Sequence, residues 1–397
     1  MMKVMMPAQP ELLIEAGSFR RLPELLQAGG YRSPVLVTGG RSVRGRDEWG
    51  IVTEALLEAG YPFLEFTVRG EPSPETVNDA IGEILRDAPG SDVVVAIGGG
   101  SALDTGKAVA AGAAMAVAAK AAAPGNKEGT FDISRYLEGV GDREPSGETL
   151  PLIAFPTTAG TGTEASMNAV ISRIGPGGFK KSLRHPRFVP SMAIIDPDLH
   201  QGCPLEVTRA CGLDAVTQLL EAYVSIAASP LTDALAALGL QKAGASFPRL
   251  IAGEDTPELR AEMALAAYLS GVCLAAAGLG LVHGFASPLG AMRDIPHGVV
   301  CGLLLGPTVE HALRKDSVSR SPADHRSKYG NAARAMGFTS AAAMVEQFFD
   351  WAEALRRLEE YRFTQAEIPL IARNTGLKNH PVKVEEQESI RILESIL

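Results

Sequence analysis

The chain has 397 residues, of which 46% are hydrophobic and 21% are charged, and its formal net charge at pH 7 is -9. This composition is typical of a packed globular protein of two to three domains and excludes a disordered chain. Lysine and arginine form only short pairs such as Lys180-Lys181. We therefore expect no nucleic-acid partner, because a phosphate backbone requires a basic patch.

The apolar segments and the cysteines indicate a cytoplasmic protein without a membrane segment. Residues 1–10 contain one lysine and no long apolar run, so no signal peptide is expected. The most apolar stretch, 108–123, is rich in alanine, carries Lys120 and is too weakly hydrophobic to span a bilayer. None of the four cysteines belongs to a C-x-x-C pair, which favours free thiols in a reducing compartment.

The first half of the chain alternates strand and helix patterns. Helices are predicted at 51–59, at 74–87 with Ser73 as N-cap, and from about 103 onward. Short apolar runs predict buried strands at 34–38, 63–68, 92–97, 152–155 and 192–195. This order predicts a parallel sheet covered by helices on both faces. Residues 124–149 are rich in Gly, Pro and charge, and are expected to form a surface loop.

The second half of the chain is helical in pattern. After Asp196, helices are predicted at 206–227, 232–247, 258–277 and 341–361. We place the domain boundary near Asp196, with an α/β domain at 1–196 and an all-α domain at 197–397.

The strand predicted at 92–97 runs into the string GGGSALDTGK, residues 98–107. Glycines let backbone N–H groups approach a phosphate closely, and the following helix N-terminus adds partial positive charge. The string matches neither G-x-G-x-x-G nor the Walker loop. Such a turn is also typical of an ordinary tight connection between a strand and a helix.

Four further strings follow in order: PTTAGTGTE at 156–164, IIDP at 194–197, Asp214 to Ser225, and His283 to Gly290 followed by Pro296-His297-Gly298. With these five landmarks the sequence resembles the iron-dependent (group III) alcohol dehydrogenases, which are related to glycerol dehydrogenase and dehydroquinate synthase. The resemblance covers nearly the whole chain. It implies a dehydroquinate synthase-like α/β domain followed by an all-α domain.

The resemblance implies a nicotinamide cofactor. Asp104 would lie near the nicotinamide as a catalytic residue, and Lys180 would reach the ribose; a solvated surface pair is the alternative for Lys180 and Lys181. Gly99, Gly100 and Ser101 would hold the pyrophosphate, with Gly98 also in the cofactor-binding loop. Thr157, Thr158 and Thr161 would contact the cofactor through their hydroxyls.

The end of the first strand bears on the choice between NAD and NADP. NAD-preferring members of the family typically have an aspartate there, which repels a 2′-phosphate; this chain has Gly39. Arg41 and Ser42 could bind the phosphate, so we favour NADP. The alternative is that Arg41 points into solvent.

The family binds a divalent metal, Fe²⁺ or Zn²⁺, through an aspartate and three histidines. The matching positions are Asp214, Gln218, His283 and His297, with spacings of 4 (218 − 214), 65 (283 − 218) and 14 (297 − 283). The metal would act as a Lewis acid, and His283 and His297 would be catalytic as well as ligands. Gln218 replaces one histidine ligand, and an amide oxygen is a weaker ligand than imidazole.

A second departure is Ser287, which stands where the family commonly has a histidine beside the nicotinamide. Three hypotheses stay open. In the first, the site binds metal through Asp214, His283 and His297, with Gln218 as a weak ligand. In the second, the site is metal-poor and uses one of the histidines as proton donor. In the third, the site is a non-catalytic NAD(P)-binding pocket.

The expected function is reversible hydride transfer between an alcohol, which becomes an aldehyde or ketone, and NAD(P), at a divalent-metal site in the cleft between the two domains of a homodimer. A lyase resembling dehydroquinate synthase is disfavoured, because only Arg209 and Arg293 lie near the metal positions in sequence. Glu221 and Tyr223 are expected to stabilise helices. The remaining histidines are expected at the surface or at caps: His185, His200, His311, His325 and His380.

Overall fold

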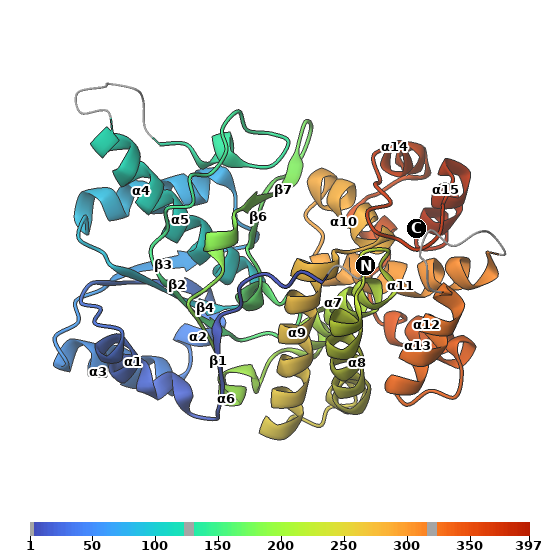
Figure 1. Ribbon diagram of the computed structural model, residues 1–397, viewed down its shortest axis with the longest axis horizontal. Coiled ribbons are helices and arrows are strands. Elements are labelled where there is room, and N and C mark those ends of the chain that lie inside the picture. The colour runs from blue at the N-terminus through green and yellow to red at the C-terminus, as the bar shows by residue number, and fades with distance from the viewer. Residues whose placement is uncertain (1–3, 123–130, 316–323) are drawn as a thin grey trace.

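The computed structural model describes residues 4–122, 131–315 and 324–397, apart from the side chains of Arg41 and Ala122. The chain forms two parts that lie side by side, an α/β part in blue to green and a helical part in yellow to red (Figure 1). The predicted boundary at Asp196 falls between the last strand and the first helix of the helical part. That the two parts are separate domains stays a prediction.

Within the described ranges, the main sheet has six parallel strands in the order β1-β8-β5-β4-β2-β3. Their bounds are β1 Glu11–Ile14, β2 Pro34–Gly39, β3 Leu64–Val68, β4 Val93–Gly98, β5 Leu152–Pro156 and β8 Met192–Ile195. The predicted parallel sheet is confirmed. β1 was not predicted, because this edge strand is only partly buried and lacks the continuous apolar run of the strands inside the sheet.

Helices cover both faces of this sheet, and alternate residues of its strands reach the two cores. Leu36 and Val95 pack with α1 (Leu22–Ala28) and α3 (Asp47–Glu58). Val37 and Ala96 pack with α4 (Pro74–Asp87) and α5 (Gly100–Ala122). The continuous apolar runs of β2 and β4 are explained by burial on both sides.

The predicted start of α4 is confirmed by its cap. The backbone N–H of Thr76 donates to Ser73 Oγ at 3.1 Å, and Pro74 occupies the first turn, where its missing N–H costs no helical hydrogen bond. The short helix α2 (Arg41–Arg44) follows β2.

A two-stranded antiparallel hairpin, β6 (Asn168–Arg173) and β7 (Phe179–Arg184), stands beside the main sheet and packs against α10. It was not predicted. The connections also contain short 3-10 turns: η1 Ser18–Arg21, η2 Ile133–Tyr136, η3 Thr163–Ala165 and η4 Pro186–Phe188. Of the predicted surface loop at 124–149, residues 124–130 lie outside the described residues.

The helical part is built around α7, whose residues from 212 to 224 are all buried. Its elements are α6 Pro197–His200, α7 Leu205–Val224, α8 Pro230–Ile251, α9 Pro257–Ala277, α10 Leu281–Met292, α11 His297–Arg314, α12 His325–Ala335, α13 Ala341–Ala352, η5 Leu358–Tyr361, η6 Gln365–Glu367, α14 Ile368–Arg373 and α15 Glu386–Glu394.

One predicted helix in this part is wrong in extent. The segment 341–361 is not a single helix, because α13 ends at Ala352 and the chain then turns. The turn buries Leu355 and Leu358 and lets the N–H of Leu358 donate to Ile396 O at 3.3 Å. Packing against the chain terminus overrides helix propensity here.

Helix α9 is apolar and long enough to cross a membrane by length and composition, but 67% of its apolar window is buried inside the protein. It packs against α7 and α8, so its apolar composition is that of a core helix.

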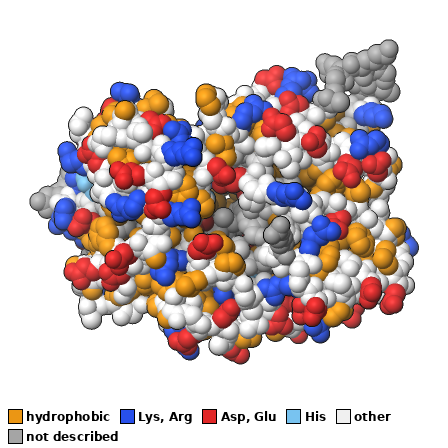
Figure 2. All heavy atoms as spheres, turned by 180° about the vertical axis from the view of Figure 1, so that it is seen from behind, with side chains coloured by type: hydrophobic (Ala, Val, Ile, Leu, Met, Phe, Trp, Pro, Cys, Tyr) orange, Lys and Arg blue, Asp and Glu red, His pale blue; other side chains and the backbone are white. Residues whose placement is uncertain are grey.

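On the face drawn in Figure 2, acidic and basic side chains are interspersed.

The prediction for the remaining histidines is partly wrong. His200, His325 and His380 are buried, at 1%, 4% and 1% exposure. His325 Nε2 lies 3.1 Å from Ala312 O and so fixes the start of α12 against the end of α11. His185 does serve as a cap, because its Nδ1 accepts the N–H of Arg187 at 3.2 Å.

Candidate active site

The glycine loop joins β4 to α5 at the carboxyl edge of the sheet. Gly98 has φ +153°, and a β-carbon there would lie 2.7 Å from Ala102 Cβ and 3.0 Å from Gly39 N. Glycine is therefore required at this turn. Ligands of open parallel sheets bind at this edge, next to a helix N-terminus.

The threonine segment packs directly on the loop. A β-carbon at Gly99 would come within 3.1 Å of Thr158 Oγ1, and one at Gly100 within 2.9 Å of Thr161 Oγ1. The N–H of Thr157 donates to Gly98 O at 2.9 Å. Two landmarks 58 residues apart (156 − 98) thus form one surface of backbone N–H groups and hydroxyls.

The predicted 2′-phosphate residues lie beside this loop. A β-carbon on Gly39 would find its nearest neighbour, Gly98 Cα, at 3.7 Å, so no contact forces glycine at this position. Ser42 is exposed on α2. Arg41 opens α2, but its side chain lies outside the described part of the structure.

Asp104 lies in the second turn of α5, after Ser101 in the first, and is 7% exposed. Thr163 Oγ1 donates to its carboxylate at 3.1 Å. Burial raises the pKa of Asp104 to about 6, although the ammonium of Lys107 opposes this rise.

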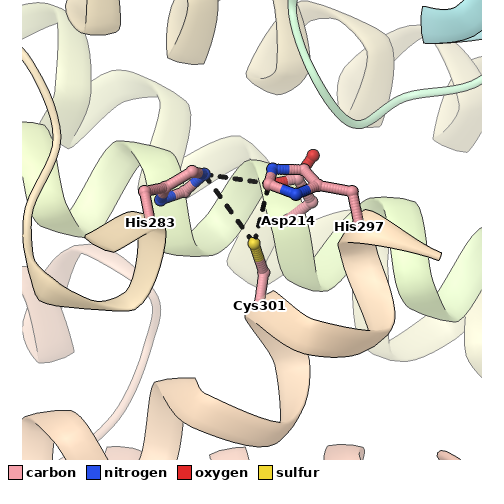
Figure 3. A group of neighbouring side chains, drawn as sticks. All are labelled: Asp214, His283, His297 and Cys301. Carbon is pink, nitrogen blue, oxygen red and sulfur yellow. Dashed lines mark hydrogen bonds and ion pairs between the residues drawn. The ribbon is translucent and has the colours of Figure 1, made fainter. Parts of the chain in front are cut away.

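The predicted metal residues Asp214, His283 and His297 are brought together from α7, α10 and α11 (Figure 3). Asp214 Oδ1 lies 3.4 Å from His283 Nε2 and 3.7 Å from His297 Nε2. It is buried and has no hydrogen-bond partner among the described residues. A buried carboxylate oxygen that accepts no hydrogen bond is costly even beside two imidazoles, and a bound cation would compensate it.

A fourth side chain, Cys301, joins this cluster and was missed by the sequence analysis. Its Sγ lies 3.7 Å from Nε2 of His283 and 3.7 Å from Nε2 of His297. All four ligand-type atoms of the cluster lie within 4.8 Å of one another. A signal was present in the sequence, because Cys301 follows His297 by one helical turn.

Glu221 orients the first histidine of the cluster. Its Oε2 accepts the Nδ1–H of His283 at 2.7 Å, which leaves Nε2 facing the cluster. The same carboxylate accepts the N–H groups of Gly280 at 2.9 Å and Val282 at 2.7 Å, at the start of α10. Glu221 therefore stabilises a helix, as predicted, and also fixes the imidazole as metal sites require.

The charges within the cluster favour an anionic aspartate. Burial alone would raise the pKa of Asp214, but His297 and His283 outweigh burial and hold that pKa at about 2. Burial lowers the pKa of His297 to about 4, and burial raises that of Cys301 to about 12. Near pH 7 the cluster therefore contains an anionic Asp214 and a neutral Cys301 thiol.

Gln218 and Ser287, the two departures from the family pattern, both form hydrogen bonds to backbone. Gln218 Nε2 donates to Thr161 O at 3.3 Å, and its Oε1 is buried without a partner among the described residues. Ser287 Oγ donates to Lys180 O at 3.2 Å. Gln218 thus joins the helix that carries Asp214 to the threonine segment of the loop.

Lys180 lies on β7 and is not a solvated surface residue, because its side chain is only 9% exposed. Its ammonium pairs with Glu71, which also accepts the Ser172 hydroxyl at 2.8 Å. The charge of Lys180 opposes the rise that burial causes in the pKa of Asp104, and it adds to the lowering that burial causes in the pKa of His297. It therefore lies between the loop side and the metal side of the site.

This arrangement defines a class of protein: a parallel α/β fold whose glycine loop is joined to a helical part that carries a metal-type cluster. Two family models match the chain, "Iron-containing alcohol dehydrogenase" at residues 9–197 and "Fe-containing alcohol dehydrogenase family, C-terminal" at residues 208–397. The chain belongs to the iron-containing alcohol dehydrogenase family, as the sequence landmarks predicted.

Individual relatives agree with this assignment. Lactaldehyde reductase of Escherichia coli K12 is 32% identical over 337 residues, which are 83% of this chain and 79% of that protein. The probable alcohol dehydrogenase EutG of the same strain is 38% identical over 240 residues, 60% of this chain. The match spans only 55% of the length of EutG. The iron containing alcohol dehydrogenase from Thermococcus thioreducens has a similar structure, with a TM-score of 0.81 at 25% identity over 99% of both chains.

Proposed function

We propose that this protein is an NAD(P)-dependent alcohol dehydrogenase that transfers a hydride reversibly between a small alcohol and the nicotinamide. In the oxidative direction the alcohol loses a hydride to NAD(P)⁺ and a proton to solvent, giving an aldehyde or ketone. The observation that carries the proposal is the convergence of Asp214, His283 and His297 beside the glycine loop, joined to it by the hydrogen bond from Gln218 to Thr161.

The cofactor would occupy the surface formed by the loop and the threonine segment. Backbone N–H groups of Gly98, Gly99, Gly100 and Ser101 and the hydroxyls of Thr157, Thr158 and Thr161 would hold its phosphates. Asp104 and Lys180 would flank the nicotinamide and its ribose. We favour NADP over NAD, because Gly39 leaves the position beside the loop without a carboxylate.

A divalent metal, Fe²⁺ or Zn²⁺, would be held by Asp214, His283 and His297. When bound, it would supply Lewis-acid polarisation of the substrate oxygen. Gln218, predicted as a weak fourth ligand, can offer only Oε1, because its Nε2 donates to Thr161 O. Glu221 would keep Nε2 of His283 directed at the metal position, and the surrounding burial would exclude water from the reacting groups.

The test is an assay of purified protein loaded with Zn²⁺ or Fe²⁺ against a panel of small alcohols, aldehydes and ketones with NADP and NAD. We expect metal-dependent turnover that is lost in Asp214→Ala. Absence of turnover with every metal and substrate, with NADP still bound, would favour the non-catalytic alternative. Turnover that survives metal removal would favour the metal-poor reductase.

We also propose a homodimer located in the cytoplasm, as expected from the family resemblance and the free cysteines. Size-exclusion chromatography with light scattering tests the first of these proposals.

A further inference from the structure

Cys301 adds a fourth potential metal-donor atom to the cluster of Asp214, His283 and His297. It lies on α11 four residues after His297, its side chain is buried at 0% exposure, and Figure 3 shows its sulfur directed toward both imidazoles. On the other side of the set, the carboxylate of Asp214 is 1% exposed and its Oδ1 has no hydrogen-bond partner in the described residues.

Four of the six separations between these atoms are close to those of a tetrahedral coordination shell, and all six are within 4.8 Å. With metal–nitrogen and metal–oxygen distances of about 2.05 Å and a metal–sulfur distance of about 2.3 Å, ligand atoms of a tetrahedron lie about 3.3 to 3.6 Å apart. The measured separations are 3.4 Å and 3.7 Å from Asp214 Oδ1 to the two histidines, and 3.7 Å from Cys301 Sγ to each. No large rearrangement is needed to place an ion at their centre.

We propose that Cys301 is itself a metal ligand, as a thiolate; this proposal rests on the metal site of the proposed function. Cys301 would supply the fourth donor, which the family takes from a histidine at the position of Gln218. The site would then have one oxygen, two nitrogen and one sulfur donor. Binding exchanges the thiol proton for the metal–sulfur bond, and that proton leaves to solvent. Such a donor set selects zinc over a hard cation, because thiolate is a soft ligand.

The surroundings of Gln218 agree with this division of roles. Its amide N–H is engaged by the backbone carbonyl of Thr161, so its position depends on the threonine segment. An amide oxygen is neutral and binds a metal more weakly than a thiolate. In this proposal Gln218 acts as a bridge between the loop and α7 through its Nε2, its buried Oε1 has no hydrogen-bond partner among the described residues, and Cys301 acts as the ligand.

Cobalt substitution tests the proposal directly. Thiolate-bound Co²⁺ absorbs strongly in the near ultraviolet through sulfur-to-metal charge transfer, whereas Co²⁺ bound by nitrogen and oxygen alone does not. We expect this band at one Co²⁺ per chain in the wild type and in Gln218→Ala. It should be lost in Cys301→Ser. The matched control is Cys273→Ser, because Cys273 is equally buried but lies outside the cluster, with its Sγ near Thr232 O at 3.7 Å.

Zinc titration gives a second measurement. Removing a residue that only hydrogen-bonds to a metal ligand weakens metal binding by up to about 100-fold. Cys301→Ser removes a ligand itself, so it should weaken zinc binding by at least about 100-fold. Circular dichroism and NADP binding establish that the variant is folded. The Gln218→Ala variant should retain most of the zinc affinity.

The outcomes separate this proposal from the proposed function. One bound Co²⁺ without the charge-transfer band overturns the role of Cys301 and leaves the metal-dependent dehydrogenase intact. A band that persists in Cys301→Ser also overturns it. Failure of the wild type to bind any Co²⁺ or Zn²⁺ contradicts the metal site of the proposed function itself.

Discussion

Glu221 controls the direction in which His283 presents its second ring nitrogen. It accepts the Nδ1–H at 2.7 Å from a fully buried position on α7. In Glu221→Gln the side chain keeps its shape but loses the negative charge that fixes this tautomer. We expect the metal Kd to rise about 10- to 100-fold. Metal titration checks this, with NADP affinity as the control that the loop is unaffected. An unchanged metal Kd would show that His283 is oriented without Glu221.

Gly39 is the residue that we expect to decide the cofactor. An added side chain fits there, since the nearest atom to a new β-carbon is 3.7 Å away. The carboxylate of Gly39→Asp should repel a 2′-phosphate and shift the ratio of kcat/KM for NADP over NAD by about 100-fold toward NAD, or about 2.7 kcal/mol. Gly39→Ala adds the carbon without the charge and should leave the ratio unchanged. If Gly39→Asp had the same ratio of kcat/KM for NADP over NAD as the wild type, the predicted role of Gly39 in a preference for NADP would be refuted.

Residue spacing predicted part of the cluster and missed part. Asp214, His283 and His297 were predicted from the resemblance to the family, whose ligand spacing they match, and the structure brings them together. Cys301 was missed although it follows His297 by one helical turn, and for Glu221 only the stabilisation of a helix was predicted, because its contact with His283 is tertiary. Glu221 lies on the same face of α7 as Asp214, seven residues on, but its partner His283 is 62 residues away in sequence. Only the fold, which brings the start of α10 to the carboxylate of Glu221, reveals this contact.

Among the elements, those with strong periodicity were predictable and those with polar composition were not. The buried strands of the sheet and α4 follow from apolar runs and a capping serine. The hairpin of β6 and β7 carries Lys180, Lys181 and Arg184 and lacks a regular apolar alternation. The hairpin forms because β6 packs against α5 and β7 packs against α10. The local sequence pattern does not encode such tertiary contacts.

The contact between α5 and η3 contains buried charges that make stability depend on pH. Lys107 Nζ donates to the carbonyls of Thr163, Ser166 and Asn168 at 2.9, 2.6 and 2.7 Å. Beside it, burial raises the pKa of Glu164 from 4.5 to about 7. The folded chain therefore holds the Glu164 proton more tightly than the unfolded chain does. The resulting stabilisation is complete below pH 4.5 and is lost as the pH rises to about 7.

Glu164→Gln should remove this dependence. Relative to the variant, the wild type should lose about 3 kcal/mol of unfolding free energy between pH 4.5 and pH 8. Urea unfolding at both pH values measures it. Glu353→Gln, at an exposed carboxylate, is the matched control and should show no such change. A constant difference between wild type and Glu164→Gln across this range would contradict the buried-charge explanation.

At the scale of the whole molecule, metal binding should stabilise the folded chain, because its ligands come from three separate helices. At a free Zn²⁺ concentration of 100 times Kd, the unfolding free energy should rise by about 2.7 kcal/mol. Urea unfolding with Zn²⁺ or with a chelator checks this. Asp214→Ala should unfold at the same urea concentration in both conditions. Equal responses of wild type and variant would show that zinc stabilises the protein elsewhere.

The position of β1 at the edge of the sheet has a consequence for biosynthesis. β1 ends at Ile14 and pairs with β8, which begins at Met192, so 177 residues lie between them (192 − 14 − 1). Asp196 completes the junction by accepting the N–H groups of Gly17 at 3.0 Å and Phe19 at 2.9 Å. At ribosomal rates this partner follows β1 after about 10 to 40 s. Throughout that interval β1 lacks its partner strand, and a nascent chain stopped before β8 exposes an unpaired edge at β5 that a chaperone or a second chain can bind.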